Sequence, residues 1–150
     1  MKLAEALQER TSLNCRIAQM NSRLCNNALV QEGEKPAEDP AELLAELDEC
    51  LARLEELIAR INLTNCKTAE NGKSITDMIA KRDCLNTKID LYRTLCDNAS
   101  CAAGRATRSE IKIVSTVDVR QLRKRLDEMS KELRLTDNTI QRLNWETDLM

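Results

Sequence analysis

Histidine and phenylalanine are absent from this sequence of 150 residues, which has one tryptophan, one tyrosine, three glycines and two prolines. Without histidine there is no His-based catalytic triad, no histidine general base and no histidine metal ligand. Without phenylalanine, the core must be built from Leu, Ile, Met and Ala, which suits knobs-into-holes packing between helices. The sequence also contains no Gly-rich phosphate loop and no G-x-S-x-G motif, so we expect a protein without enzymatic activity.

The residues also argue against a metal, a cofactor and a nucleic acid. The seven cysteines form no C-x-x-C pair, and the closest two, Cys96 and Cys101, do not have a zinc-site spacing. The acidic stretch at 32–39 lacks the spacing and the glycine of an EF-hand. The basic stretch at 120–125 spreads around a helix in a chain that has almost no aromatic residues to stack bases. We expect no cofactor, no metal, no nucleic-acid partner and no small-molecule substrate.

No stretch of the sequence predicts export or a membrane span. Charged residues interrupt the first ten residues, MKLAEALQER, where a secretion signal would be apolar. The uncharged stretches are far shorter than the ~20 residues that a membrane-spanning helix needs. We therefore expect a cytoplasmic protein whose cysteines are reduced thiols.

Heptad-like spacing of apolar residues predicts four long helices. They are expected at about 2–32, 40–66, 75–103 and 116–144, in a single all-α domain covering 1–150. The second helix has the clearest apolar stripe, formed by Leu44, Leu47, Leu51, Leu54, Ile58 and Ile61. Two architectures fit: an antiparallel bundle, or coiled-coil hairpins that complete their core in an oligomer. The narrow seams favour the second.

Caps and turns mark the expected ends of these helices. Gly33 is expected to end the first helix in a left-handed conformation, and Ser115 to cap the fourth. The other signals are residue types that favour a helix start or a turn: Asp39 with Pro40, Asn71 with Gly72, and Ser74 with Asp77.

Charge is unevenly distributed along the chain. Residues 32–49 contain eight acids and one lysine, a net charge of −7, whereas residues 105–125 contain seven bases and two acids, a net charge of +5. In an alternating bundle the first and third connections lie at the same end. We therefore predict that the two segments pair, within one chain or between chains. The residues proposed for this pairing are Glu32, Glu34, Glu38, Arg105, Arg108 and Arg120.

The stretch SEIKIVSTVDV (109–119) differs from the helices around it. Its β-branched residues alternate with polar ones, which predicts a short extended segment near 109–114. The rest of the chain offers no complementary strand. The segment either covers the end of the helices with its backbone in water, or pairs with the same segment of a second chain, and we favour the pairing. The predicted homo-oligomer contacts are Ile111, Ile113, Val114 and Val117.

Three stretches resemble one known family: VQEGEKPAEDPAELLAELDE (30–49), RSEIKIVSTVDV (108–119) and LNWETDL (143–149). Together they are similar to the septicolysin-like family of small bacterial proteins, and the resemblance covers essentially the whole chain. It implies an all-helical protein with no assigned enzyme activity, and the family name implies a cytolytic role. Two functional hypotheses follow: a self-associating helical scaffold or interaction protein, or a membrane-perturbing protein of cytolysin type.

Overall fold

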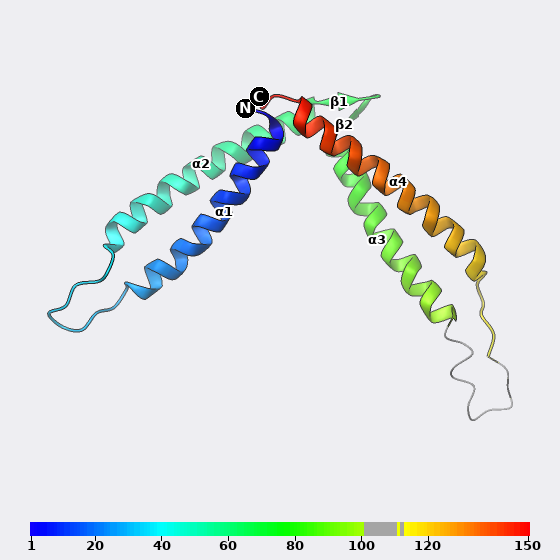
Figure 1. The fold of residues 1–150 in the computed structure, drawn as a ribbon, viewed down its shortest axis with the longest axis horizontal. Helices are drawn as coiled ribbons and strands as arrows, with labels where there is room; N and C mark the ends of the chain where they lie inside the picture. The colour runs from blue at the N-terminus through cyan, green and yellow to red at the C-terminus, as the bar shows by residue number, and fades with distance from the viewer. Residues whose placement is uncertain (101–110, 112) are drawn as a thin grey trace. The chain divides into compact units, whose positions relative to one another are not determined.

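The computed structural model describes residues 1–100, 111 and 113–150. The helices of the described chain are α1 (Leu3–Asn26), α2 (Pro40–Lys67), α3 (Ile75–Ser100) and α4 (Val119–Glu146) (Figure 1). Two short strands, β1 (Ala69–Glu70) and β2 (Lys73–Ser74), form a hairpin between α2 and α3. The fold is therefore all-α, as predicted, and its helices pack as antiparallel neighbours in the pairs α1 with α2 and α3 with α4.

The helix starts predicted from Asp39 and Ser74 are confirmed. The side chain of Asp39 accepts a hydrogen bond from the Ala41 N–H at 2.8 Å, and Pro40 is the first helical residue of α2. At α3, the Asp77 N–H donates to the Ser74 hydroxyl at 3.1 Å, and the Ser74 N–H donates to the Asp77 carboxylate at 2.9 Å. This reciprocal pair satisfies N–H groups that a helix start leaves without partners.

The predicted turn at Asn71–Gly72 is also confirmed. Both residues have positive φ angles, 52° and 77°, and they connect β1 to β2. A two-residue hairpin with both central φ angles positive matches the twist of its strands, and asparagine followed by glycine is the pair that best tolerates this backbone. The sequence predicted the turn but not the two strands of this hairpin, which lie within residues 69–74.

Two helix ends differ from the prediction. α1 ends at Asn26 instead of near residue 32, and Gly33 has its positive φ of 89° in the connection instead of at the helix end. α4 begins at Val119 instead of 116, because Asp118 caps it by accepting the Gln121 N–H at 3.0 Å. Ser115 instead forms a local turn, in which its hydroxyl donates to the Val117 carbonyl at 2.8 Å. The expected end of the third helix, at 103, lies outside the described residues.

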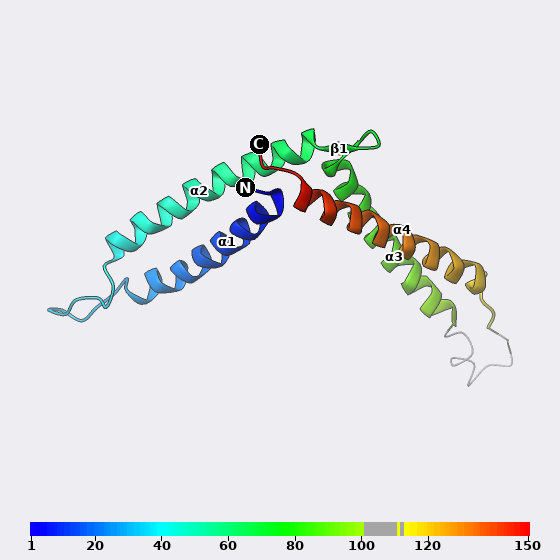
Figure 2. The ribbon, with the colours of Figure 1, turned by 45° about the horizontal axis from the view of Figure 1, so that its top comes forward.

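The structure has two compact units. Unit 1 comprises Met1–Glu70 and Leu143–Met150, and unit 2 comprises Asn71–Arg142. In unit 1, α1 and α2 lie side by side in both Figure 1 and Figure 2. The fully buried side chains of unit 1 are Leu3, Ala6, Met20, Leu57, Ile61 and Thr64.

The two ends of the chain are joined within unit 1. Lys2 and Asp148 form an antiparallel β-bridge, and their side chains form an ion pair at 2.9 Å. The Thr64 hydroxyl accepts the Met150 N–H at 3.0 Å and donates to the Arg60 carbonyl at 2.8 Å. Buried Thr64 therefore has both of its hydrogen-bonding roles satisfied.

In unit 2, α3 packs against α4. The Lys81 ammonium of α3 pairs with the Glu132 carboxylate of α4 at 2.5 Å. The buried apolar side chains of this unit are Ile75, Met78, Ile89, Cys96, Met129 and Ile140. A pair of helices thus buries one narrow row from each partner, as expected for antiparallel neighbours.

Candidate functional site

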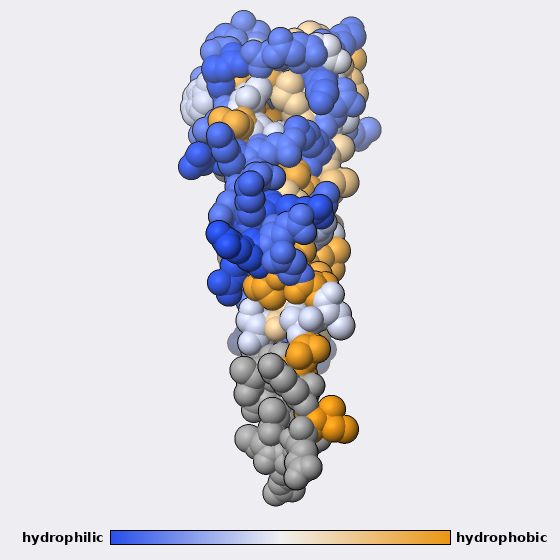
Figure 3. Space-filling model, turned by 90° about the vertical axis from the view of Figure 1, so that its right-hand side faces the viewer, coloured by the Kyte–Doolittle hydropathy of each residue, from blue (hydrophilic) through white to orange (hydrophobic). Residues whose placement is uncertain are grey.

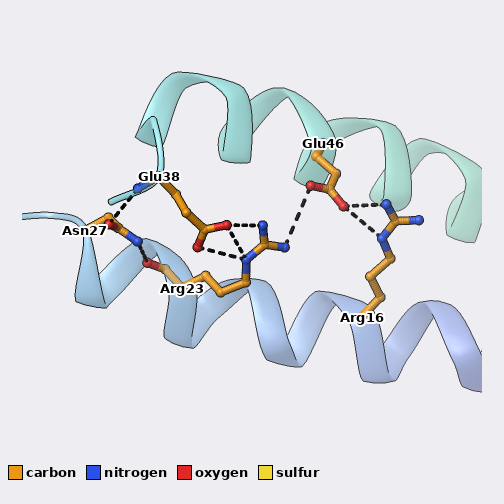
Figure 4. Close-up of polar contacts among 5 residues, drawn as sticks. All are labelled: Arg16, Arg23, Asn27, Glu38 and Glu46. Carbon is orange, nitrogen blue, oxygen red and sulfur yellow. Dashed lines mark hydrogen bonds and ion pairs between the residues drawn. The ribbon is translucent and has the colours of Figure 1, made fainter. Parts of the chain in front are cut away.

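A row of ion pairs connects α1 with α2 and with Glu38, just before α2, in unit 1 (Figure 4). The guanidinium of Arg23 donates through Nε to both carboxylate oxygens of Glu38 at 3.1 Å, and Arg16 donates through Nε to Glu46 at 2.9 Å. Further along the pair, Arg53 of α2 donates through Nε to Glu9 of α1 at 2.7 Å. The residue numbers on α1 fall as those on α2 rise, so these pairs specify the antiparallel register of the two helices.

These contacts favour the ionised carboxylates. The hydrogen bond from Arg23 lowers the pKa of Glu38 below its ordinary 4.5, and the hydrogen bond from Arg53 does the same for the pKa of Glu9. In unit 2, Lys81 lowers the pKa of Glu132 in the same way. All of these groups lie in contact with solvent, so the ion pairs orient the helices and add little to the free energy of unfolding.

The apolar residues predicted to mediate self-association are largely exposed. Ile111, Ile113 and Val114 are 78%, 47% and 65% exposed, whereas Val117 is half-buried in the turn before α4. These four described residues belong to neither a helix nor a strand, and the neighbouring positions 109, 110 and 112 lie outside the described residues. Figure 3 shows hydrophobic side chains exposed among hydrophilic ones on one face of the molecule. Strand pairing between chains stays a prediction.

The residues predicted to pair by charge are not brought together by any described contact. Glu38 is engaged with Arg23 of its own unit, while Glu32 and Glu34 are exposed in the connection between α1 and α2. Arg120 is exposed on the first turn of α4 in unit 2. Arg105 and Arg108 lie outside the described residues. The charge pairing between the two segments therefore stays a prediction.

Sequence reasoning missed which side of α2 is covered. α1 covers the row that contains Leu43, Cys50 and Leu57, which are 3%, 6% and 0% exposed. The next row around the helix, named here the α2 row, is formed by Leu44, Leu51 and Ile58. Their side chains remain 50%, 45% and 39% exposed, respectively. The sequence signal was the unusual width of the apolar face of α2, which has more apolar residues than one neighbouring helix can cover.

Grooves lie between α3 and α4 in unit 2. A groove of about 280 Å³ between α3 and α4 is lined by Lys88, Tyr92, Arg125, Glu128, Met129 and Glu132. The ammonium of Lys88 lies over the Tyr92 ring at 5.7 Å from its centre, a contact within α3. In the part of the chain that the structure describes, no three cysteine or acidic side chains gather as a metal site, and no helix is long and apolar enough to cross a membrane.

Comparison with known proteins places the chain among proteins without an assigned role. Residues 10–149 match the model of DUF6847, described as a family of unknown function. A crystal structure of a functionally unknown conserved protein from Corynebacterium diphtheriae is similar over 100% of this chain and 99% of that chain, with 44% sequence identity and a TM-score of 0.90. No curated protein matches the sequence.

Proposed function

The chain belongs to DUF6847, a family of unknown function. We propose that it is a non-enzymatic helical protein that self-associates and serves as a scaffold or interaction protein. The observation that carries the proposal is the exposure of large apolar side chains at Ile111, Ile113 and Val114. Neighbouring exposed apolar residues on a soluble chain are characteristic of interaction sites, because leaving them in water is unfavourable.

The proposed assembly is a homo-oligomer in the cytoplasm. Five described cysteines are free thiols, which is the state that a reducing compartment maintains: Cys15, Cys25, Cys50, Cys84 and Cys96. The segment around Ile113 from two copies supplies apolar contact, and the acidic connection near Glu32 and Glu34 lies against basic residues such as Arg120 of another copy. Arg105 and Arg108 belong to the same basic stretch of the sequence.

The mass in solution tests this proposal. Light scattering behind size exclusion, with reductant present, is expected to give a multiple of 17.0 kDa for the wild-type chain. Ile113→Asp is expected to shift the mass towards the monomer, whereas Thr116→Asp, an exposed polar position in the same segment, is expected to leave it unchanged. A wild-type monomer at micromolar concentration would refute the proposed function.

The resemblance to septicolysin-like proteins supports a second candidate, a membrane-perturbing protein of cytolysin type. One observation favours it: the Trp145 side chain is 55% exposed, and an amphipathic ring of this kind suits a membrane interface. The test is release of a dye from liposomes of mixed neutral and anionic lipids, with Trp145→Ala as the comparison. Liposomes that stay intact at micromolar protein exclude this candidate.

A further inference from the structure

The α2 row is a continuous apolar surface without a partner in its unit. Leu44, Leu51 and Ile58 are seven residues apart, so they lie on one side of the helix and extend over about 21 Å. Between this row and the side covered by α1 lie Leu47 and Leu54, which are half-buried. Heptad spacing with graded exposure is the pattern of a helix that has room for a second neighbour.

The geometry of α2 explains why α1 leaves this row uncovered. Successive residues of an α-helix differ by about 100° around its axis, so the row of Leu44 lies about 100° from the row of Leu43. α1 is centred on the side of Leu43, Cys50 and Leu57, which are buried. One helix covers only one side of its partner, and the α2 row therefore stays accessible.

Both arginines of α2 are engaged within its own unit, whereas two of its acids border the α2 row. Arg53 and Arg60, seven residues apart, are both engaged within unit 1: Arg53 pairs with Glu9, and Arg60 donates to the Met150 carbonyl at 2.8 Å. Two exposed acids of α2, Asp48 and Glu55, follow Leu44 and Leu51 by four residues and so lie beside the α2 row, and they have no ion pair among the described residues. The side of α2 that carries the row is therefore apolar and acidic, and it fits an apolar, basic partner.

The first half of α4 has this complementary character. Its four bases, named here the α4 cluster, follow closely along the chain, are exposed on more than one side of the helix and have no ion pair among the described residues: Arg120, Arg123, Lys124 and Arg125. Val119, Leu122 and Leu126 of the same turns are half-buried and supply an apolar edge beside these bases.

We propose that the α2 row of one copy binds the α4 cluster of a second copy, so that the acidic and apolar side of unit 1 meets the basic and apolar edge of unit 2. The inference rests on the proposed self-association alone, and it assigns the bases of α4, Arg120 included, to the α2 row instead of to the connection near Glu32 and Glu34. Opposite charges across an interface determine which surfaces meet and in which register. Contact of α2 with α2 of a second copy would place Asp48 and Glu55 against like charges, which disfavours that pairing.

Charge exchange tests the proposal. Asp48→Lys/Glu55→Lys and Arg120→Glu/Arg123→Glu are each expected to shift the mass towards the monomer in light scattering. A mixture of the two variants, or one chain carrying all four substitutions, is expected to restore the oligomer, because opposite charges face each other again. Restoration also shows that the variants are folded. Oligomers that persist in both variants, or variants that stay monomeric when mixed, overturn the inference and leave self-association standing.

The apolar side chains of the α2 row are tested by one variant and a matched control. Leu51→Asp is expected to weaken association roughly tenfold or more, because it places a charge at the centre of the row. Leu63→Asp is the control, because Leu63 is 44% exposed on the same helix but lies outside the row, and it is expected to leave association unchanged. Equal effects of the two substitutions would contradict the proposal.

Two further measurements distinguish the alternatives. Raising NaCl from about 0.05 M to about 0.5 M is expected to weaken the oligomer, since salt screens attraction between opposite charges. Association that strengthens with salt would indicate the α2–α2 contact and overturn the inference. If Glu32→Lys/Glu34→Lys loses association while Asp48→Lys/Glu55→Lys keeps it, the acidic surface of the interface is the connection between α1 and α2. That outcome would also overturn the inference. A monomeric wild-type chain removes both this inference and the proposed function.

Discussion

The side chain of Asn27 holds the backbone of Glu38 across the connection between α1 and α2. Its amide oxygen accepts the Glu38 N–H at 3.1 Å, and its amide nitrogen donates to the Arg23 carbonyl at 2.9 Å in the last turn of α1 (Figure 4). One side chain thus both ends α1 and positions the start of the next helix, where Glu38 in turn pairs with Arg23.

Asn27→Ala is expected to loosen this connection. The substitution removes both side-chain hydrogen bonds and is expected to lower the free energy of unfolding by about 1 kcal/mol. Amide hydrogen exchange should quicken over 27–38 more than in the middle of α1. The matched control is Asn26→Ala at the neighbouring exposed position, where exchange is expected to change little. Equal exchange in the two variants would contradict the role of Asn27.

Leu57 is expected to be a principal source of stability in unit 1. Its side chain is fully buried, so Leu57→Ala should lower the free energy of unfolding by about 2–5 kcal/mol, through lost apolar burial and the cavity that remains. Leu63→Ala on the same helix removes the same atoms from a side chain that is 44% exposed, and it should cost much less. Urea denaturation followed by circular dichroism measures both, and similar costs would show that the packing of α2 is misassigned.

Stability is expected to fall in acid and to be flat near neutral pH. The folded chain holds the pKa of Glu9, Glu38 and Glu132 below the ordinary 4.5, so the unfolded chain binds protons first as the pH falls. The stabilisation from these three carboxylates is complete above about pH 5.5, and it is lost as the pH falls through their lowered pKa values. The sequence contains no histidine to titrate between about pH 5.5 and 7.

Melting temperatures at a series of pH values measure this dependence. The Glu38→Gln variant should lose less stability between pH 6 and acid than the wild type, because it has one fewer depressed carboxylate. A melting temperature that changes strongly between about pH 5.5 and 7 would be contrary to this expectation.

A side chain at position 72 is expected to lower the free energy of unfolding. The φ of Gly72 is 77°, and a Cβ added there would meet nothing within 4 Å, so the cost of Gly72→Ala comes from the backbone alone. It should amount to about 1 kcal/mol in thermal or urea unfolding. Asn71→Gly serves as the comparison, because glycine accepts the φ of 52° that Asn71 already adopts, and it should not share this loss.

Helix starts and turns were predictable from the sequence because their contacts are local. Asp39 caps through a residue two positions away, Ser74 and Asp77 are three positions apart, and Asn71–Gly72 adopts the backbone that its own residues favour. The end of α1 was not predictable, because Asn27 finds its partner at Glu38, eleven positions along the chain. The start of α4 was misplaced because Ser115 and Asp118 both suit a cap, and Asp118 occupies it.

The sequence by itself determined that the chain is four long helices, because a repeat of apolar residues close to the helical period fits no other regular structure. It also determined the three short-range signals that start or connect them, at Asp39, at Asn71–Gly72 and at Ser74 with Asp77. Only the tertiary structure decided which side of α2 is covered, since Leu43 and Leu44 are equally apolar and only the position of α1 distinguishes them. The physical reason is that the hydrophobic effect has no direction of its own. The sequence supplies more apolar surface on α2 than one neighbouring helix can cover. The packing of α1, which is oriented by its ion pairs, selects which part of this surface stays exposed.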